Sequence, residues 1–232
     1  MTFGGNSTVA IIDSRFDIGH PDLASKFIVN YDPYSLVNHT TYSYIPNHDD
    51  NHGTFVASCA IAETDGGGQL ASIGFDTEFY AYTWNNGIFK AHHASMILDV
   101  DVISISWFYD CSPDPSGVDS TIISDILNNG TIIVAAAGNG FHGASCSSGG
   151  GPPFSPLFPF SPTYDNRIIC VSSIGEDNNH YFEDNGANQT HSYFPEVDIC
   201  APGYLVMGAQ PSLNNQWPYF GGGKGTSFAT LW

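Results

Sequence analysis

Four polar residues of this sequence have the types and settings that acyl-transfer chemistry needs. Asp13 ends an apolar run, and Asn139 follows another one. His52 and Ser227 each stand at the start of a helical pattern. A serine hydroxyl attacks a carbonyl when an imidazole accepts its proton and a carboxylate holds that imidazole in the right tautomer. An amide N–H of asparagine, or the N–H groups at a helix start, stabilises the oxyanion that forms.

Apolar runs and helical patterns alternate along the chain, and the strands and helices that they predict must position these four residues. The predicted strands are 8–13, 100–107, 131–137, 168–174 and 197–200. The predicted helices are 52–63, 90–99 and 117–129, and the predicted loops are 30–50, 140–163 and 208–225. This order favours an α/β fold, a mostly parallel sheet with helices on both faces. In such a sheet the chemistry-bearing side chains project from the carboxyl ends of the strands.

The composition limits what the chain binds. Its 232 residues are 42% hydrophobic, which is enough for the core of one domain over residues 1–232. Five Lys plus Arg against 23 Asp plus Glu give a formal net charge of −18. Nucleic-acid binding and adhesion to anionic membranes both need clustered basic residues, so we expect no nucleic-acid partner and no membrane partner. No apolar run reaches the ~18–20 residues of a membrane span.

Four segments, taken together and in order, carry a more specific signal than any residue alone. They are Val9-Ala-Ile-Ile-Asp13-Ser14 with His20-Pro-Asp-Leu23, then His52-Gly-Thr-Phe-Val-Ala-Ser58, Ile133-Val-Ala-Ala-Ala-Gly-Asn139 and Gly225-Thr-Ser-Phe-Ala229. A fifth segment, Val197-Asp-Ile-Cys-Ala-Pro-Gly203, precedes the last of them. In these segments, from residue 8 to residue 230, the chain resembles the subtilisin-like serine proteases, the subtilases.

The resemblance implies a three-layer fold, an endopeptidase activity and a role for each residue. Ser227 would be the nucleophile, His52 the general base and then the general acid, and Asp13 the group that orients His52. Asn139 and the Ser227 backbone N–H would form the oxyanion hole. A peptide or protein substrate would add as a strand beside residues 104–107, and residues 136–138 would form a wall of the pocket beside the scissile bond. The substrate-binding residues implied in this way are Ser104, Ile105, Ser106, Trp107, Ala136, Ala137 and Gly138.

Some residues depart from the family pattern and leave a second function open. Arg15 and Phe108 stand where the family usually has glycine. The chain ends at Trp232, five residues after Ser227, and little sequence precedes Asp13. The resemblance therefore implies a domain that is incomplete at the C-terminus and short at the N-terminus. A catalytically impaired homologue that binds peptides or proteins is the alternative to an active endopeptidase.

The predicted chemistry requires no cofactor and no metal. The resemblance leaves room for structural calcium, with loop carboxylates as candidate ligands at Asp32, Asp114, Asp165 and Asp177. A cluster with zinc-like spacing, which lacks a Glu-based motif, is formed by His48, Asp49, Asp50 and His52. We therefore predict no metal in the catalytic site.

Substrate preference and compartment follow only from weaker patterns. The acidic residues before His52 show a faint similarity to the kexin branch, which cleaves after basic pairs, and Asp110 is the nearest carboxylate for such a pocket. Solvated acidic loops are the simpler interpretation. The family resemblance indicates a monomer that is secreted, extracellular or vacuolar.

The cysteines and the glycosylation sequons add little to this prediction of compartment. Cysteines in apolar contexts, predicted to be buried, are Cys59, Cys170 and Cys200, while Cys111 and Cys146 are candidates for a disulfide. Sequons occur at Asn6, Asn38, Asn129 and Asn188, about as many as chance gives.

Overall fold

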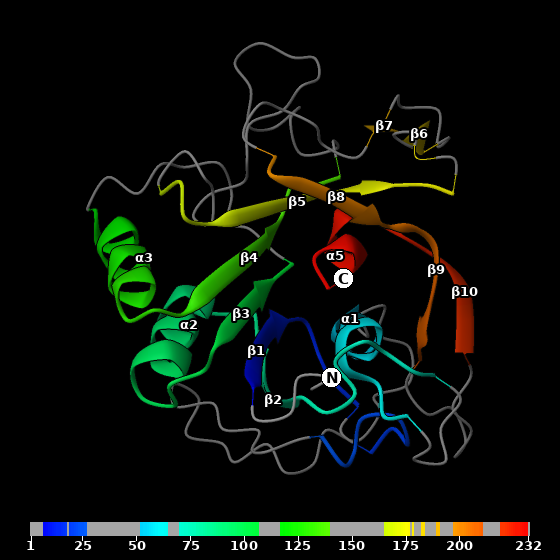
Figure 1. Ribbon diagram of the computed structural model, residues 1–232, viewed down its shortest axis with the longest axis horizontal. Helices are drawn as coiled ribbons and strands as arrows, with labels where there is room; N and C mark the ends of the chain where they lie inside the picture. Colours follow the sequence, from blue (N-terminus) through cyan, green and yellow to red (C-terminus); the bar gives the residue numbers. More distant parts are fainter. Residues whose placement is uncertain are drawn as a thin grey trace.

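A six-stranded sheet forms the centre of the molecule (Figure 1). The computed structural model describes residues 7–17, 19–26, 52–64, 70–106, 117–139, 165–176, 178, 182–183, 189–190, 197–210 and 219–231. The strand order is β2-β1-β3-β4-β5-β8, and every neighbouring pair is parallel. The strands are β1 (Thr8–Asp13), β2 (Glu78–Thr83), β3 (Val102–Ile105), β4 (Ile132–Ala136), β5 (Ile169–Ile174) and β8 (Ile199–Pro202). The predicted parallel α/β sheet is confirmed.

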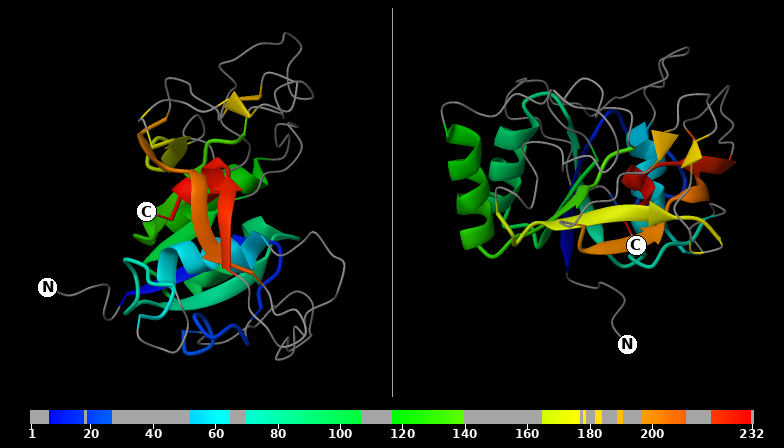
Figure 2. Two further views of the ribbon diagram at one scale, coloured as in Figure 1. Left: turned by 90° about the vertical axis from the view of Figure 1, so that its right-hand side faces the viewer. Right: turned by 90° about the horizontal axis from the view of Figure 1, so that it is seen from above.

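Helices cover the sheet on both faces (Figure 2). The helices are α1 (His52–Ile61), α2 (Gly87–Met96), α3 (Val118–Asn128) and the short α5 (Thr226–Ala229). Successive strand residues point to opposite faces, so Ile12 packs with α2 and α3, while Ile11 packs with Phe55 and Val56 of α1. The continuous apolar runs of the strands are therefore buried on both sides. The predicted three layers are confirmed.

One predicted helix differs from the structure in position, and one strand of the structure was not predicted. The helix predicted over 90–99 is α2, which lies about one turn earlier, because left-handed backbone at Asn86 and Asp99 (φ 55° at both) ends the helical conformation on either side. Strand β2 was not predicted. Its sequence, Glu-Phe-Tyr-Ala-Tyr-Thr, contains no Val or Ile, and tertiary burial of Phe79 and Ala81 stabilises it instead.

The loop predicted over 208–225 is wrong in part, because its last residues form a strand. Strand β9 (Tyr204–Ala209) pairs antiparallel with β10 (Tyr219–Lys224). Gly208 of β9 and Gly223 of β10 lie directly on the ring of Phe55 in α1. A Cβ atom at Gly208 would lie 2.5 Å from Phe55 Cδ1, and one at Gly223 would lie 2.6 Å from Phe55 Cζ. Glycine is required here for close approach inside a strand, and it does not mark a loop.

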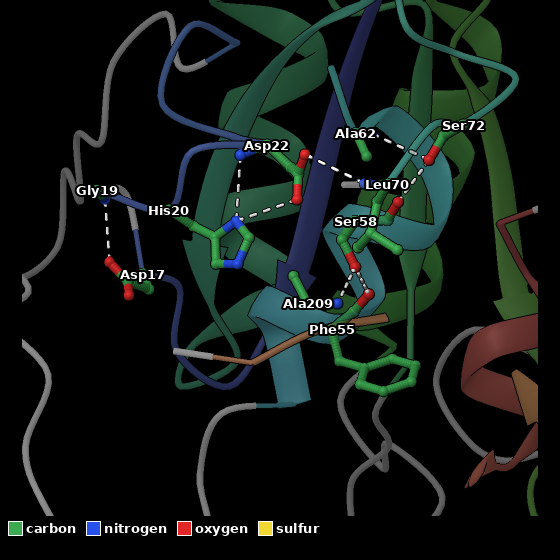
Figure 3. A network of polar contacts seen from close by, with 10 residues as sticks. All are labelled: Asp17, Gly19, His20, Asp22, Phe55, Ser58, Ala62, Leu70, Ser72 and Ala209. Carbon is green, nitrogen blue, oxygen red and sulfur yellow. Dashed lines mark hydrogen bonds and ion pairs between the residues drawn. The ribbon is translucent and has the colours of Figure 1, made fainter. Parts of the chain in front are cut away.

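Figure 3 shows two groups of polar contacts, one around His20 and Asp22 in the segment after β1 and one that ties strand β9 to α1 through Ser58. The Asp22 N–H donates to His20 Nδ1 at 3.2 Å, and neither side chain has any exposure. Ser58 of α1 donates to the Phe55 carbonyl and accepts from the Ala209 N–H, both at 2.7 Å. Burial is the main influence on His20 and lowers the pKa of its imidazole, against the opposing effects of the Asp22 and Asp17 carboxylates. The Ser58 hydroxyl therefore fixes α1 against strand β9.

The remaining described elements are small. Strands β6 (Phe182–Glu183) and β7 (Gln189–Thr190) form an antiparallel pair of their own. Among the described residues, no helix is long and apolar enough to cross a membrane.

Candidate active site

The sequence-predicted residues Asp13 and Asn139 lie at the carboxyl edge of the sheet. Asp13 is the last residue of β1, and Asn139 lies three residues beyond the end of β4. Because all strands of this sheet are parallel, their carboxyl ends share one edge. Figure 1 shows α1 and α5 close together on one side of this edge. The edge therefore collects groups that are far apart in the sequence.

Asp13 and His52 are in direct contact. His52 Nδ1 lies 2.7 Å from Asp13 Oδ1, and the Ser14 N–H donates to the same oxygen at 2.6 Å. Asp13 is 2% exposed, whereas the His52 side chain is 36% exposed. A carboxylate at Nδ1 favours the tautomer with its proton on that nitrogen, so the lone pair lies on Nε2. The partly exposed ring can therefore act as a base toward the solvent side.

Helix α5 holds Ser227 on the same side of the sheet as His52. Ser227 is 7% exposed and stands in the only turn of α5. The ring of Phe228, the next residue, lies 5.4 Å from the His52 ring and 4.6 Å from the Phe55 ring, measured between centroids. The Thr230 hydroxyl donates to the Ser227 carbonyl at 2.7 Å. Aromatic packing thus joins the helix that carries Ser227 to the helix that begins at His52.

Asn139 is fixed against the start of α5 through Thr226. Its Oδ1 accepts the Thr226 N–H at 2.8 Å and the Thr226 hydroxyl at 3.1 Å. Since a backbone N–H can only donate, the amide oxygen must face Thr226, and Nδ2 is the atom left to act as a donor. The Thr226 hydroxyl also accepts the Gly138 N–H at 3.0 Å. Gly225, with φ 151°, leaves room for the amide, because a Cβ atom there would lie 3.2 Å from Asn139 Nδ2.

Sequence reasoning missed the role of Thr226 in this arrangement. The residue is fully buried and bonds both Gly138 and Asn139. The only signal in the sequence is its place between Gly225 and Ser227 in a matched motif.

The residues predicted to bind substrate divide into two sets. Ser104 and Ile105 have β1 on one side and β4 on the other, so a further strand has no room to pair beside them. Ser106 follows the end of β3 and is half-buried, and its hydroxyl lies 3.4 Å from the Ser227 carbonyl. Ala136 is half-buried, while Ala137 and Gly138 are buried. Of the predicted substrate-binding segment 104–107, Ser106 is therefore the described residue that does not lie between two paired strands.

Several other predictions fall outside the described residues. These are the ones on Asn6, Asp32, Asn38, His48, Asp49, Asp50, Trp107, Phe108, Asp110, Cys111, Asp114, Cys146, Asp177 and Asn188. Within the described ranges, no group of three or more His, Cys, Asp or Glu side chains gathers as a metal site. Asp165 forms a bidentate pair with Arg167, at 2.6 and 2.9 Å, which lowers the pKa of its carboxyl. This pairing already occupies both oxygens of one candidate calcium ligand.

The described residues correct one prediction on the cysteines and show the backbone conformation at Arg15. Cys59 and Cys170 are buried as predicted, but Cys200 is exposed because it lies on β8, the edge strand of the sheet. Arg15, where the family usually has glycine, is not among the residues with positive φ. Its backbone therefore does not need the freedom of glycine. The sequon residue Asn129 lies within the described residues, and its side-chain amide donates to the Ser95 carbonyl at 3.1 Å.

Residues 4–231 match the family model described as Peptidase S8, the subtilase family. The chain belongs to the subtilase family. It is 28% identical over 230 residues to the thermophilic serine proteinase of Bacillus sp. (strain AK1), a match that covers 96% of this chain and 49% of the relative. It is 29% identical over 243 residues to the subtilisin of Bacillus pumilus, covering 98% of this chain and 74% of the relative. The chain thus spans between about half and three quarters of the length of these subtilases.

A solved structure supports the fold independently. The prenylagaramide maturation protease PagA superposes with a TM-score of 0.65 at 19% identity, over 99% of this chain and 73% of that one. At this identity the likeness concerns the fold, and it agrees with the parallel sheet described above.

Proposed function

We propose that this subtilase is a serine endopeptidase that hydrolyses peptide bonds through Ser227, His52 and Asp13. The observation that carries the proposal is the 2.7 Å contact between His52 Nδ1 and Asp13 Oδ1, with the Phe228 ring of α5 packed against the same imidazole. An imidazole whose Nδ1 is bonded to a buried carboxylate carries its lone pair on Nε2, as a general base requires. Membership of a peptidase family supports the same conclusion.

The proposed reaction has two halves, and in each of them His52 accepts one proton and then gives one up. Ser227 Oγ attacks the peptide carbonyl while His52 Nε2 accepts its proton, and Asp13 stabilises the imidazolium that results. Asn139 Nδ2 and the Ser227 N–H donate to the oxyanion. The tetrahedral intermediate collapses as His52 protonates the leaving amine, which gives the acyl-enzyme. Water then attacks the ester with His52 as the base, and Ser227 is released with its proton restored.

The proposed substrate is an extended peptide that pairs as a strand from Ser106 onward, opposite the wall formed by Ala136 and the residues after it. The net charge of −18 favours basic peptides over acidic ones, so a kexin-like preference for basic residues is one specific form of the proposal. The chemistry uses no metal, although structural calcium elsewhere is compatible with it. We further propose that the chain acts as a monomer outside the cytoplasm, in a secreted or vacuolar setting.

A peptide library tests the activity and the preference together. The chain is incubated with the library, and cleavage products are identified by mass spectrometry. Ser227→Ala serves as the inactive variant, and Ser120→Ala, on the exposed start of α3, serves as the matched control. We expect cleavage by the unaltered chain and by Ser120→Ala only. A folded chain that binds peptides and leaves them intact would favour the binding-module alternative.

A further inference from the structure

The segment that follows β1 runs along the first turn of α1 and bonds it at three places. The Ser14 hydroxyl accepts the Gly53 N–H at 3.1 Å, and the Arg15 carbonyl accepts the Thr54 N–H at 3.1 Å. In the opposite direction, the Asp17 N–H donates to Thr54 Oγ1 at 2.8 Å. We call these three contacts the clasp. It joins the segment after Asp13 to the helix that begins at His52.

The clasp satisfies groups that a helix cannot satisfy itself. The first N–H groups of an α-helix have no acceptor within the helix, and a side-chain oxygen usually caps them. Here the cap for Gly53 comes from Ser14, 39 residues earlier in the chain. The fit is close, because a Cβ atom at Gly53 would lie 2.6 Å from the Arg15 carbonyl oxygen. The position of the first turn therefore depends on the clasp.

Ser14 also contacts the carboxylate that orients the imidazole. Its N–H donates to Asp13 Oδ1 at 2.6 Å, and this is the oxygen that contacts His52. Asp13 Oδ2 is buried and accepts no hydrogen bond from any residue within the described ranges. The orientation of the carboxylate thus rests on Oδ1. One residue, Ser14, holds Asp13 through its backbone and the residue after His52 through its hydroxyl.

We propose that Ser14 is a positioning residue, whose hydroxyl places the first turn of α1, and with it the His52 ring, against the Asp13 carboxylate. The inference rests on the proposed function, since it concerns the geometry of the same site. Removing the hydroxyl leaves the Gly53 N–H without its acceptor and allows the helix start to shift. Small misplacements of a catalytic group cost up to ~100-fold in rate. We expect Ser14→Ala to lower kcat roughly tenfold with KM within about twofold.

The substitutions Ser14→Ala, Ser14→Thr and Ser14→Val separate the effect of the hydroxyl from the effect of side-chain shape. Ser14→Thr keeps the hydroxyl, and Ser14→Val has the shape of threonine without it. Ser120→Ala is the control, because it removes a hydroxyl that bonds the Gly117 carbonyl at 2.9 Å in the first turn of α3. We expect kcat to fall in the Ala and Val variants, to recover in the Thr variant and to stay unchanged in Ser120→Ala. Equal kcat values for Ser14→Val and Ser14→Thr would overturn the proposal.

Two further measurements do not depend on peptide hydrolysis. In the Ser227→Ala background, the low-field proton resonance of His52 Nδ1 reports its bond to Asp13, and we expect it to move when Ser14 becomes Ala but not when it becomes Thr. In the unaltered chain, the Gly53 amide should exchange slowly with solvent because it is bonded. Fast exchange of that amide, or a His52 Nδ1 proton resonance that does not move when Ser14 becomes Ala, contradicts the role of Ser14. Both results can be obtained whether or not the chain cleaves peptides.

Discussion

Replacement of Thr226 by valine tests how the oxyanion side of the site is held. Valine keeps the shape of threonine but removes the hydroxyl that accepts the Gly138 N–H at 3.0 Å and donates to Asn139 Oδ1 at 3.1 Å. A buried N–H that loses its acceptor costs about 1–3 kcal/mol, and the lost hydroxyl bond costs about 0.5–1.5 kcal/mol. The free energy of unfolding should therefore fall by roughly 2–4 kcal/mol.

The same substitution should slow catalysis less than loss of the donor itself. Asn139 Oδ1 keeps its bond from the Thr226 N–H at 2.8 Å, so the amide stays in place but is held less firmly. We expect kcat to fall about tenfold, or ~1.4 kcal/mol. Denaturant unfolding and steady-state kinetics measure the two effects, with Thr226→Ser as the control that keeps the hydroxyl. If the stability and the kcat of the valine variant both match those of the serine variant, the Thr226 hydroxyl does not hold this side of the site.

Three further predictions follow from other parts of the molecule. Asn139→Ala should lower kcat by roughly 10²–10³ with little change in KM, the loss seen for such a donor in subtilisin; an unchanged kcat contradicts its role. Gly208→Ala should lower the free energy of unfolding by about 1–3 kcal/mol, because its Cβ would overlap the Phe55 ring. Gly19→Ala, which meets only Asp17 Oδ1 at 3.4 Å, is the control in the same denaturation assay. Burial lowers the pKa of His20, so the folded state binds a proton less readily than the unfolded state. Stability should therefore fall as the pH drops below ~6.5, and His20→Asn should reduce this dependence in urea titrations.

The central strands could be predicted from the sequence because local pattern and burial agree there. The run Val-Ala-Ile-Ile before Asp13 is apolar at every position, as a strand covered on both faces requires, and it forms β1. The β9–β10 hairpin and Cys200 could not be predicted in the same way. Gly223 of β10 is explained by the ring of Phe55, which lies far away in the sequence. The exposure of Cys200 is explained by the position of β8 at the sheet edge.

The candidate site also has features that local sequence predicts and features that depend on distant residues. The order of Asp13, His52, Asn139 and Ser227 is visible in the sequence, because each lies in a motif of adjacent residues. The support for these residues is not visible, because the partners are distant. Thr226 bonds a residue 87 positions away. No local pattern of propensity or polarity specifies such a pair, since only the closed fold brings its members within hydrogen-bond distance.

The catalytic unit of Ser227, His52 and Asp13 is tested by the site at which a fluorophosphonate reacts, because a serine hydroxyl attacks this probe only when a neighbouring base removes its proton. The purified chain is treated with the probe, digested, and analysed by mass spectrometry. We expect a phosphonyl adduct on Ser227 that disappears in His52→Ala and forms more slowly in Asp13→Asn. A folded chain that gains no adduct, or whose labelling of Ser227 is the same in His52→Ala, would contradict the assignment of these residues to one catalytic unit.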